Sequence, residues 1–370
     1  MKRILHIVGT MDRAGAETMV MNLYRAIDKT QYQFDFVYFT EKPCAYDDEI
    51  LELGGRIFRM PDKYSKNTIS RTFKLYQLIK KQNPFYAIHC HQLLANAFHL
   101  IAAYFSGVPK RLAHAHSTRD FSKKNMVRSI YQSFSKKIIA LLATDFIACG
   151  LQPGTYLFPS VKNVVFIPNA IDVVKFLKTD NYKKNIDFFQ SNKITKDTII
   201  FSQVGRFMPV KNHEFSINYA FFLKNKGIDF HMFFVGSGYL EDETKKMVVA
   251  KDLTNYITFL GVRGDIDTIL ANSDILLMPS IYEGFPVILV ESQTAGTPAL
   301  ISGGIAPEVD LGLNLVTFCD LNESFEKWFD LTTEILKNPL PNQKKRNKVI
   351  GERGFDINIS VKLLEDIYNK

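Results

Sequence analysis

The chain has 370 residues, of which 46% are apolar and 23% charged, and its net charge is +8. This length predicts two domains of roughly 150 to 200 residues each, and no apolar run approaches the ~20 residues that span a bilayer. The excess of basic residues predicts affinity for something anionic, and charge alone does not choose among nucleic acid, an acidic membrane surface and phosphorylated ligands.

The first half of the chain alternates β-rich apolar runs with amphipathic stretches, which is typical of α/β architecture with parallel sheets. Its first strand is too short for the apolar core of a signal peptide and is followed at once by Asp12 and Arg13, so we expect a cytoplasmic protein. Helices are predicted from Ala16, over 68–81 and 94–105, and through a basic stretch after the fifth strand. The predicted strands are 3–8, 34–39, 56–59, 87–91, 111–116, 145–149 and 164–168.

The second half repeats this alternation, which predicts two Rossmann-like domains facing a cleft, with ligands beyond the carboxyl ends of the strands. The polar segment 172–196 shows no period and is interpreted as the hinge. The domains are therefore expected at 1–171 and 197–350, with 351–370 returning as a helix to the first domain. The predicted strands of this half are 198–204, 230–235, 256–260, 275–279, 298–301 and 315–318.

The four cysteines, Cys44, Cys90, Cys149 and Cys319, are scattered and form no Cys-x-x-Cys pair. Their spacing supports neither a disulfide framework nor a zinc site. We therefore expect reduced thiols, with Cys90 and Cys149 as small apolar residues in strands.

A strand, a loop and a helix are predicted in succession around Pro286. The strand ends at Met278, and the helix is expected over 287–295 and ends at Gly296, a natural residue for a helix C-terminus. Proline suits the first helical position because an N–H there has no helical partner. The start of this helix offers free N–H groups and a positive dipole end, which favour a diphosphate.

Two carboxylates flank the start of this helix. Glu283 lies ahead of it beside Gly284, and Glu291 lies roughly two turns along the chain, so both can border one pocket above the sheet. Carboxylates suit the hydroxyls of ribose and sugar beside a diphosphate. A solvent-exposed acidic pair on an ordinary helix is the alternative.

A second group follows the first strand of the second half. Gly205 and Arg206 leave this strand, and Lys211 precedes a helix. Two cations in a strand-to-helix loop can clamp a leaving diphosphate as charge develops on it. A basic surface loop remains the alternative.

Two glycine loops also follow strands. Gly15 comes after the first strand, and Gly236 and Gly238 follow 230–235. Glycine lets the backbone approach a phosphate or sugar closely, although neither loop is the Gly-x-Gly-x-x-Gly fingerprint. Either loop could instead be a simple tight turn.

Four histidines lie at the ends of two predicted strands. His114 and His116 share one face of their strand, and His89 and His91 end the preceding strand in the same way. His116, nearest the strand end, could hydrogen-bond a sugar. A metal is the alternative, but no acidic partners are near in sequence, and we expect His89 and His114 to be structural.

The stretch 110–137 contains eight Lys and Arg residues and a single Asp. Within it, apolar residues from Met126 to Leu141 follow helical spacing beside basic ones. This pattern fits a helix on an anionic membrane, and it fits equally a core helix with a solvated basic face. No nucleic-acid-binding module is recognised.

Taken together, these motifs resemble glycosyltransferase family 4, the retaining enzymes of GT-B fold, over essentially the whole chain. The stretches 300–309 and 325–328 are similar to the exopolysaccharide and capsule branch of that family. Asn169-Ala170 departs from the family's usual Asn-Gly at the hinge. The motifs that carry the resemblance are the Gly15 loop, His116, 168–172, Gly205-Arg206 with Lys211, and Glu283 with Glu291.

The resemblance implies a role for each matching residue. Arg206 and Lys211 would hold the donor diphosphate, Glu291 would bind the ribose, Glu283 would face the transferred sugar, and His116 would be the active-site histidine. The Gly15 loop, Gly284, and the backbone N–H groups of Phe285 and Val287 would complete the phosphate cradle.

The resemblance also implies the reaction. A hexosyl or N-acetylhexosaminyl group would pass from a nucleotide sugar, with UDP-sugars the expected class, to a saccharide or lipid-linked acceptor at the inner membrane face. Retention would proceed by front-face attack, with no cofactor and no metal. The alternatives are a sugar-nucleotide epimerase, a silent nucleotide-sugar-binding partner of another transferase, and a polybasic membrane-docking protein.

Overall fold

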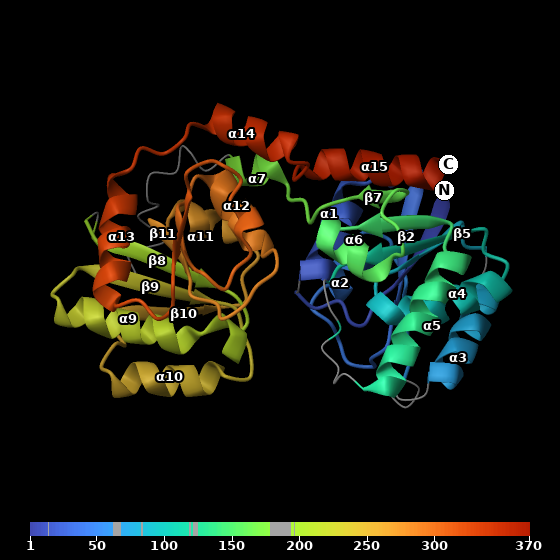
Figure 1. The fold of residues 1–370 in the computed structure, drawn as a ribbon, viewed down its shortest axis with the longest axis horizontal. Helices are drawn as coiled ribbons and strands as arrows, with labels where there is room; N and C mark the ends of the chain where they lie inside the picture. Colours follow the sequence, from blue (N-terminus) through green and yellow to red (C-terminus); the bar gives the residue numbers. More distant parts are fainter. Residues whose placement is uncertain are drawn as a thin grey trace. The chain divides into compact units, whose positions relative to one another are not determined.

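The computed structural model describes residues 1–13, 15–61, 68–82, 84–117, 120, 125–177, 194–195 and 197–370 (Figure 1). Parts of the expected hinge (178–193 and 196) and of the basic stretch (118–119 and 121–124) lie outside this description. The chain forms two compact units, one of Met1–Ala170 with Gly354–Lys370 and the other of Ile171–Arg353. None of the helices in the described ranges is long and apolar enough to cross a membrane.

The first unit is built on a seven-stranded sheet of order β3-β2-β1-β4-β5-β6-β7, and all its strand pairs are parallel. Successive strands are added on one side of β1 up to β3 and on its other side from β4 onward, as in Rossmann-type sheets. Each strand falls where the sequence predicts one. Their bounds are β1 Lys2–Ile7, β2 Tyr32–Tyr38, β3 Ile57–Arg59, β4 Ala87–Cys90, β5 Lys110–Ala115, β6 Asp145–Ala148 and β7 Val164–Phe166.

Helices cover both faces of this sheet, so most of its strand residues are buried on either side. α1 and α15 pack on one face around buried rings such as Phe34 and Tyr368, while α3, α4 and α5 cover the other. α15 therefore carries the end of the chain back onto the first unit. The helices are α1 Gly15–Ala26, α2 Asp47–Glu52, α3 Thr68–Gln82, η2 Leu93–Ala95, α4 Asn96–Phe105, α5 Met126–Leu142, α6 Leu151–Leu157 and α15 Ile357–Asn369.

The second unit repeats the design with a six-stranded parallel sheet of order β10-β9-β8-β11-β12-β13. Its order reverses between β8 and β11. Two parallel α/β sheets confirm the predicted fold class. The strands are β8 Ile199–Val204, β9 Phe230–Val235, β10 Ile257–Gly261, β11 Ile275–Met278, β12 Ala299–Ser302 and β13 Val316–Cys319.

The helices of this unit also form two layers. α9, α10 and α13 enclose an aromatic core with buried Trp328, and α7, α11, α12 and α14 form the other layer (Figure 1). α7 lies inside the segment expected to be an irregular hinge, because its Phe176 and Leu177 find burial against the unit. The helices are α7 Val173–Leu177, η4 Pro209–Lys211, α9 His213–Asn225, α10 Glu241–Ala250, α11 Ile266–Ala271, α12 Val287–Ala295, η5 Pro307–Val309, α13 Phe325–Lys337 and α14 Gln343–Glu352.

Candidate functional site

The loops with the predicted donor residues follow the two strands at which the second sheet reverses its order. β8 leads into the loop with Gly205 and Arg206, and β11 leads into the loop with Glu283. In open parallel sheets, helices diverge to opposite faces at such a switch point and leave room for a ligand. The topology therefore brings both predicted groups to one edge of one sheet.

The loop after β8 is held by backbone contacts with the loop after β9. Gly236 has φ +136°, and a Cβ there would lie 2.1 Å from the carbonyl oxygen of Gly205. A Cβ on Gly238 would lie 2.4 Å from the carbonyl oxygen of Phe207, whose N–H donates to Ser237 at 3.0 Å. Gly236 and Gly238 therefore allow the loop after β9 to pack closely against the loop that carries Arg206. They do more than form a tight turn.

Lys211 and Glu283 form an ion pair at this edge. The Nζ of Lys211 lies 2.6 Å from Oε1 of Glu283, and the side chains are only 17% and 20% exposed. The N–H of Glu283 donates to Gly304 at 3.2 Å, and its carbonyl accepts from Ala306 at 3.2 Å. The side-chain amide of Gln203 donates to the carbonyl of Lys211 at 2.8 Å. Both partners are thus fixed through their backbones before any ligand arrives.

α12 begins immediately after this loop. It spans Val287–Ala295 as predicted, with Gly296 at φ +83° ending it. Pro286 lies one position ahead of the first helical residue, so the expectation that it occupies that residue is off by one. Gly284 has nothing within 4 Å of a built Cβ, which leaves open space beside the helix start. The partly buried Phe285 and Val287 flank Pro286 here.

Glu291, on α12, has an environment that sequence reasoning missed. Burial raises the pKa of its carboxyl to about 7, opposed by the positive charge of Lys175 and reinforced by Asp267. Lys175 lies on α7, and its ammonium is 3.1 Å from Asp267. The carboxyl can therefore change protonation state near neutral pH.

Arg206 is exposed. Within the described ranges its guanidinium has no hydrogen-bond or ion-pair partner. It is therefore available to a ligand at the same edge as Lys211.

In the first unit, five imidazoles gather on one face of the sheet. His6 on β1 lies opposite His89 on β4, and His91, His114 and His116 lie toward the carboxyl ends of β4 and β5. His6 Nδ1 is 3.0 Å from His91 Nε2, and His91 Nδ1 is 2.9 Å from His116 Nε2. The sequence predicted four of these residues at one rim. It missed His6, because one histidine in a strand gives no sign of its neighbours.

Burial disfavours the charged form of all five imidazoles. Burial lowers the pKa of His116 to about 4 and places the pKa of each of the other four well below its ordinary value. His89 links to Tyr368 on α15 at 3.1 Å and to His114 at 3.2 Å. These contacts fit the structural role expected of His89 and His114, while His116 stands at the partly exposed end.

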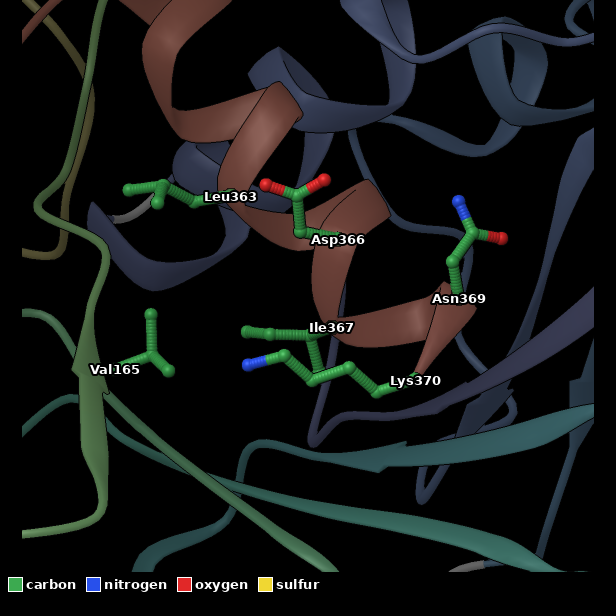
Figure 2. Close-up of a pocket in the computed structure, with 6 residues that line it drawn as sticks. All are labelled: Val165, Leu363, Asp366, Ile367, Asn369 and Lys370. Atoms are coloured by element: carbon green, nitrogen blue, oxygen red, sulfur yellow. The ribbon is translucent and has the colours of Figure 1, made fainter.

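Two further features complete the first unit. Gly15 is the first residue of α1, and a Cβ there would meet nothing within 4 Å. A shallow pocket lies between β7 and α15, lined by Val165, Leu363, Asp366, Ile367, Asn369 and Lys370 (Figure 2). Asn369 contacts Lys2 and Tyr32, the first residues of β1 and β2. The pocket is thus near the amino ends of the strands, on the opposite edge from the histidines.

Comparison with known proteins decides the family. The family model "Glycosyltransferase Family 4" matches residues 13–175, and "Glycosyl transferases group 1" matches 184–352. The Bacillus subtilis (strain 168) protein named "Putative glycosyltransferase EpsF" is 36% identical over 100% of this chain and 96% of its own length. The chain belongs to glycosyltransferase family 4.

Two further proteins resemble this glycosyltransferase along its length. An Escherichia coli UDP-Gal:alpha-D-GlcNAc-diphosphoundecaprenol alpha-1,3-galactosyltransferase is 24% identical over 99% of this chain and 96% of its own. The crystal structure of Anabaena Alr3699/HepE in complex with UDP and glucose has a TM-score of 0.75 and 15% identity, with both chains covered completely. The two-sheet architecture is thus the GT-B fold.

Proposed function

We propose that this glycosyltransferase moves a hexosyl or N-acetylhexosaminyl group from a UDP-sugar to a saccharide or lipid-linked acceptor, with retention of the anomeric configuration. The observation that carries the proposal is the Lys211–Glu283 pair at the switch point, beside the start of α12. A cation and a carboxylate fixed side by side suit the two ends of a nucleotide sugar, its diphosphate and its sugar hydroxyls.

Each site residue has its own role in the proposed transfer. Lys211 and Arg206 neutralise the charge that develops on the leaving diphosphate, with Gly284 and the N–H groups of Phe285 and Val287 around it. Glu291 accepts hydrogen bonds from the ribose, and Glu283 positions the sugar. For the first unit, the resemblance to the family assigns His116 to the sugar and the Gly15 loop to the phosphates.

The reaction requires no metal in this proposal. The acceptor hydroxyl attacks the anomeric carbon from the face that the diphosphate leaves. The new C–O bond forms as the old one breaks, and the hydroxyl proton passes to the leaving phosphate oxygen. Lys211 and Arg206 supply the positive charge for which other transferases use a divalent cation.

Two observations support the acceptor and the location that we propose. The Escherichia coli relative acts on a diphosphoundecaprenol-linked sugar, and the sequence resembles the exopolysaccharide and capsule branch of the family. We place the enzyme in the cytoplasm, peripheral on the inner membrane face and acting in surface-polysaccharide synthesis. Met126 and Ile130 of α5 support this placement, because they are 81% and 61% exposed, where a core helix would bury them.

A screen of UDP-, GDP- and ADP-sugars for thermal stabilisation and for slow hydrolysis tests the donor. We expect one UDP-sugar to raise the melting temperature and to release UDP, and Lys211→Ala to abolish both effects. Release of an altered nucleotide sugar without acceptor would instead identify an epimerase. Stabilisation without hydrolysis or transfer would identify a silent partner.

A further inference from the structure

The histidine cluster has the composition and spacing of a metal site. Ring nitrogens of His91, His114 and His116 all lie within 4.8 Å of one another. We propose that these three residues form a transition-metal site that takes Zn²⁺, and that an occupied site blocks sugar transfer. The transfer chemistry itself stays metal-free, so the site acts as an inhibitory one.

The hydrogen bonds indicate which nitrogen each ligand would use. His114 Nδ1 is engaged by His89, and its buried Nε2 has no partner among the described residues. His91 Nε2 is engaged by His6, which leaves Nδ1 on the side of His116 Nε2, 2.9 Å away. The ligand set is therefore Nε2 of His114, Nδ1 of His91 and Nε2 of His116.

The residues behind these ligands fit the usual outer shell of a metal site. A metal-bound histidine donates its other ring N–H to a neighbour, which fixes its orientation. His114 Nδ1–H can donate to His89, and His91 Nε2–H can donate to His6, at 3.2 and 3.0 Å. His89 in turn can donate from Nδ1 to the hydroxyl of Tyr368 at 3.1 Å. One set of neutral tautomers satisfies all three contacts.

The distance between His91 and His116 needs little adjustment to admit an ion. Bonds of about 2.0–2.1 Å in a tetrahedral arrangement place two ligand nitrogens roughly 3.3 Å apart. The observed 2.9 Å between His91 and His116 must therefore widen by only a few tenths of an ångström. The proton that now lies between these rings moves to Nδ1 of His116, which has no partner among the described residues.

A second group, His6 with His89 and His91, satisfies the same distance limit. It fits an ion less well, because both ring nitrogens of His89 are engaged, by Tyr368 and by His114. His6 and His89 are also fully buried, whereas His91 and His116 are partly exposed and give an ion a way in. We call His91, His114 and His116 the outer group. The lack of nearby carboxylates does not count against it, since three imidazoles and one water are a complete zinc coordination set.

An ion at this position would hold His116 by its ring nitrogen and remove it from the sugar. Inhibition therefore rests on the proposed function of His116, whereas metal binding does not. The two parts need separate measurements.

Binding is tested on the full-length, untagged protein freed of metal, titrated with Co²⁺ as a coloured substitute for Zn²⁺. We expect one equivalent to give the visible bands of four-coordinate Co²⁺, and Zn²⁺ to displace it. His116→Gln should weaken binding more than about 100-fold, beyond the effect of an outer-shell change. It also separates the two groups, because His116 belongs only to the outer one. His231→Gln, a buried histidine of the second unit, is the matched control and should bind as wild type does.

Absence of the bands in wild type, or wild-type affinity in His116→Gln, would overturn the site. The second arm follows hydrolysis of the UDP-sugar that the donor screen identifies. One equivalent of Zn²⁺ should lower the rate at least tenfold, EDTA should restore it, and Mg²⁺ should leave it unchanged. Binding without inhibition would overturn the inhibitory role. If no nucleotide sugar is hydrolysed, the proposed function fails while the Co²⁺ titration still decides the site.

Discussion

The ammonium of Lys211 lies 2.6 Å from the carboxylate of Glu283, and the two residues come from loops after neighbouring strands, β8 and β11. Each partner compensates the charge of the other in a mostly buried position. Removing one partner leaves the other charge uncompensated, which costs more than the pair itself contributes. The pair therefore links the stability of this edge to the charges that the donor would meet.

Lys211→Ala and Arg206→Ala should separate catalysis from stability. Both should lower transfer at least 100-fold, because each removes a cation from the leaving diphosphate. Lys211→Ala should also lower the free energy of unfolding by about 1–2 kcal/mol, since it leaves the carboxylate of Glu283 without its ion-pair partner. Arg206 is exposed, so its loss should leave that free energy within about 0.5 kcal/mol. Urea unfolding and turnover measure the two effects.

Lys246→Ala, another exposed cation of the second unit, is the control and should change neither quantity. Transfer at the wild-type rate in both site variants would remove the diphosphate clamp from the proposal.

Glu291→Gln should make stability depend less on pH. The carboxyl has a pKa of about 7, above its ordinary value of 4.5, so folding favours its protonated form. Its contribution to stability is complete below pH 4.5 and is lost as the pH rises through 7. The Gln variant should therefore be more stable than wild type by about 3 kcal/mol near pH 8, and equal to it near pH 4. Equal stability of the two proteins near pH 8 would contradict the raised pKa.

The same group should control donor binding. Only the ionised carboxylate accepts hydrogen bonds from both ribose hydroxyls, so wild-type affinity for the donor should rise between about pH 6 and 8. The Gln variant should bind more weakly and lose this pH dependence.

Sequence patterns predicted this site where the determinants are local. Periodicity and turn residues gave the bounds of α12, because Gly296 and the apolar spacing act within a few residues. Because ligands bind beyond the carboxyl ends of parallel strands, the sequence also predicted Glu283 and Lys211 at one edge of the sheet. Lys175 was missed because it approaches Glu291 from a polar segment more than a hundred residues earlier. Contacts of that kind depend on the packing of α7 against α12, which no local pattern encodes.

Gly236→Ala should disturb the loop that carries Arg206. Its backbone is in a region that L-residues rarely adopt, and the new Cβ would strike the carbonyl of Gly205. We expect a loss of about 2–4 kcal/mol in the free energy of unfolding, together with weaker donor binding. Gly227→Ala is the matched control: its φ is +74°, and a Cβ there meets nothing within 4 Å. It should cost only about 1 kcal/mol of backbone strain. Equal costs for the two variants would show that the close approach at Gly236 is unimportant.

EDTA should leave transfer intact, because Arg206 and Lys211 take the place of a divalent ion at the diphosphate. Turnover is compared in metal-stripped buffer with and without added Mg²⁺, and the two rates should agree. A requirement for Mg²⁺ would contradict the proposed mechanism.

The exposed face of α5 should bind anionic membranes. The sequence left two interpretations of this helix open, and the apolar residues that it singled out include Met126, Ile130, Phe134 and Leu141, all of which are exposed. The exposed Lys137 lies on the same helix. Apolar and basic side chains that share one exposed helix gain both from burial at the headgroup boundary and from anionic lipid.

Ile130→Ser combined with Phe134→Ser should therefore lower flotation with anionic vesicles about tenfold or more, since each side chain loses apolar area that the interface would cover. Val249→Ser, at an exposed apolar position on α10, is the control and should float as wild type does. Vesicles of zwitterionic lipid alone should bind every variant weakly, because the basic residues then lack their partner. Undiminished flotation of the double variant would place membrane attachment elsewhere on the chain and leave the exposed face of α5 unexplained.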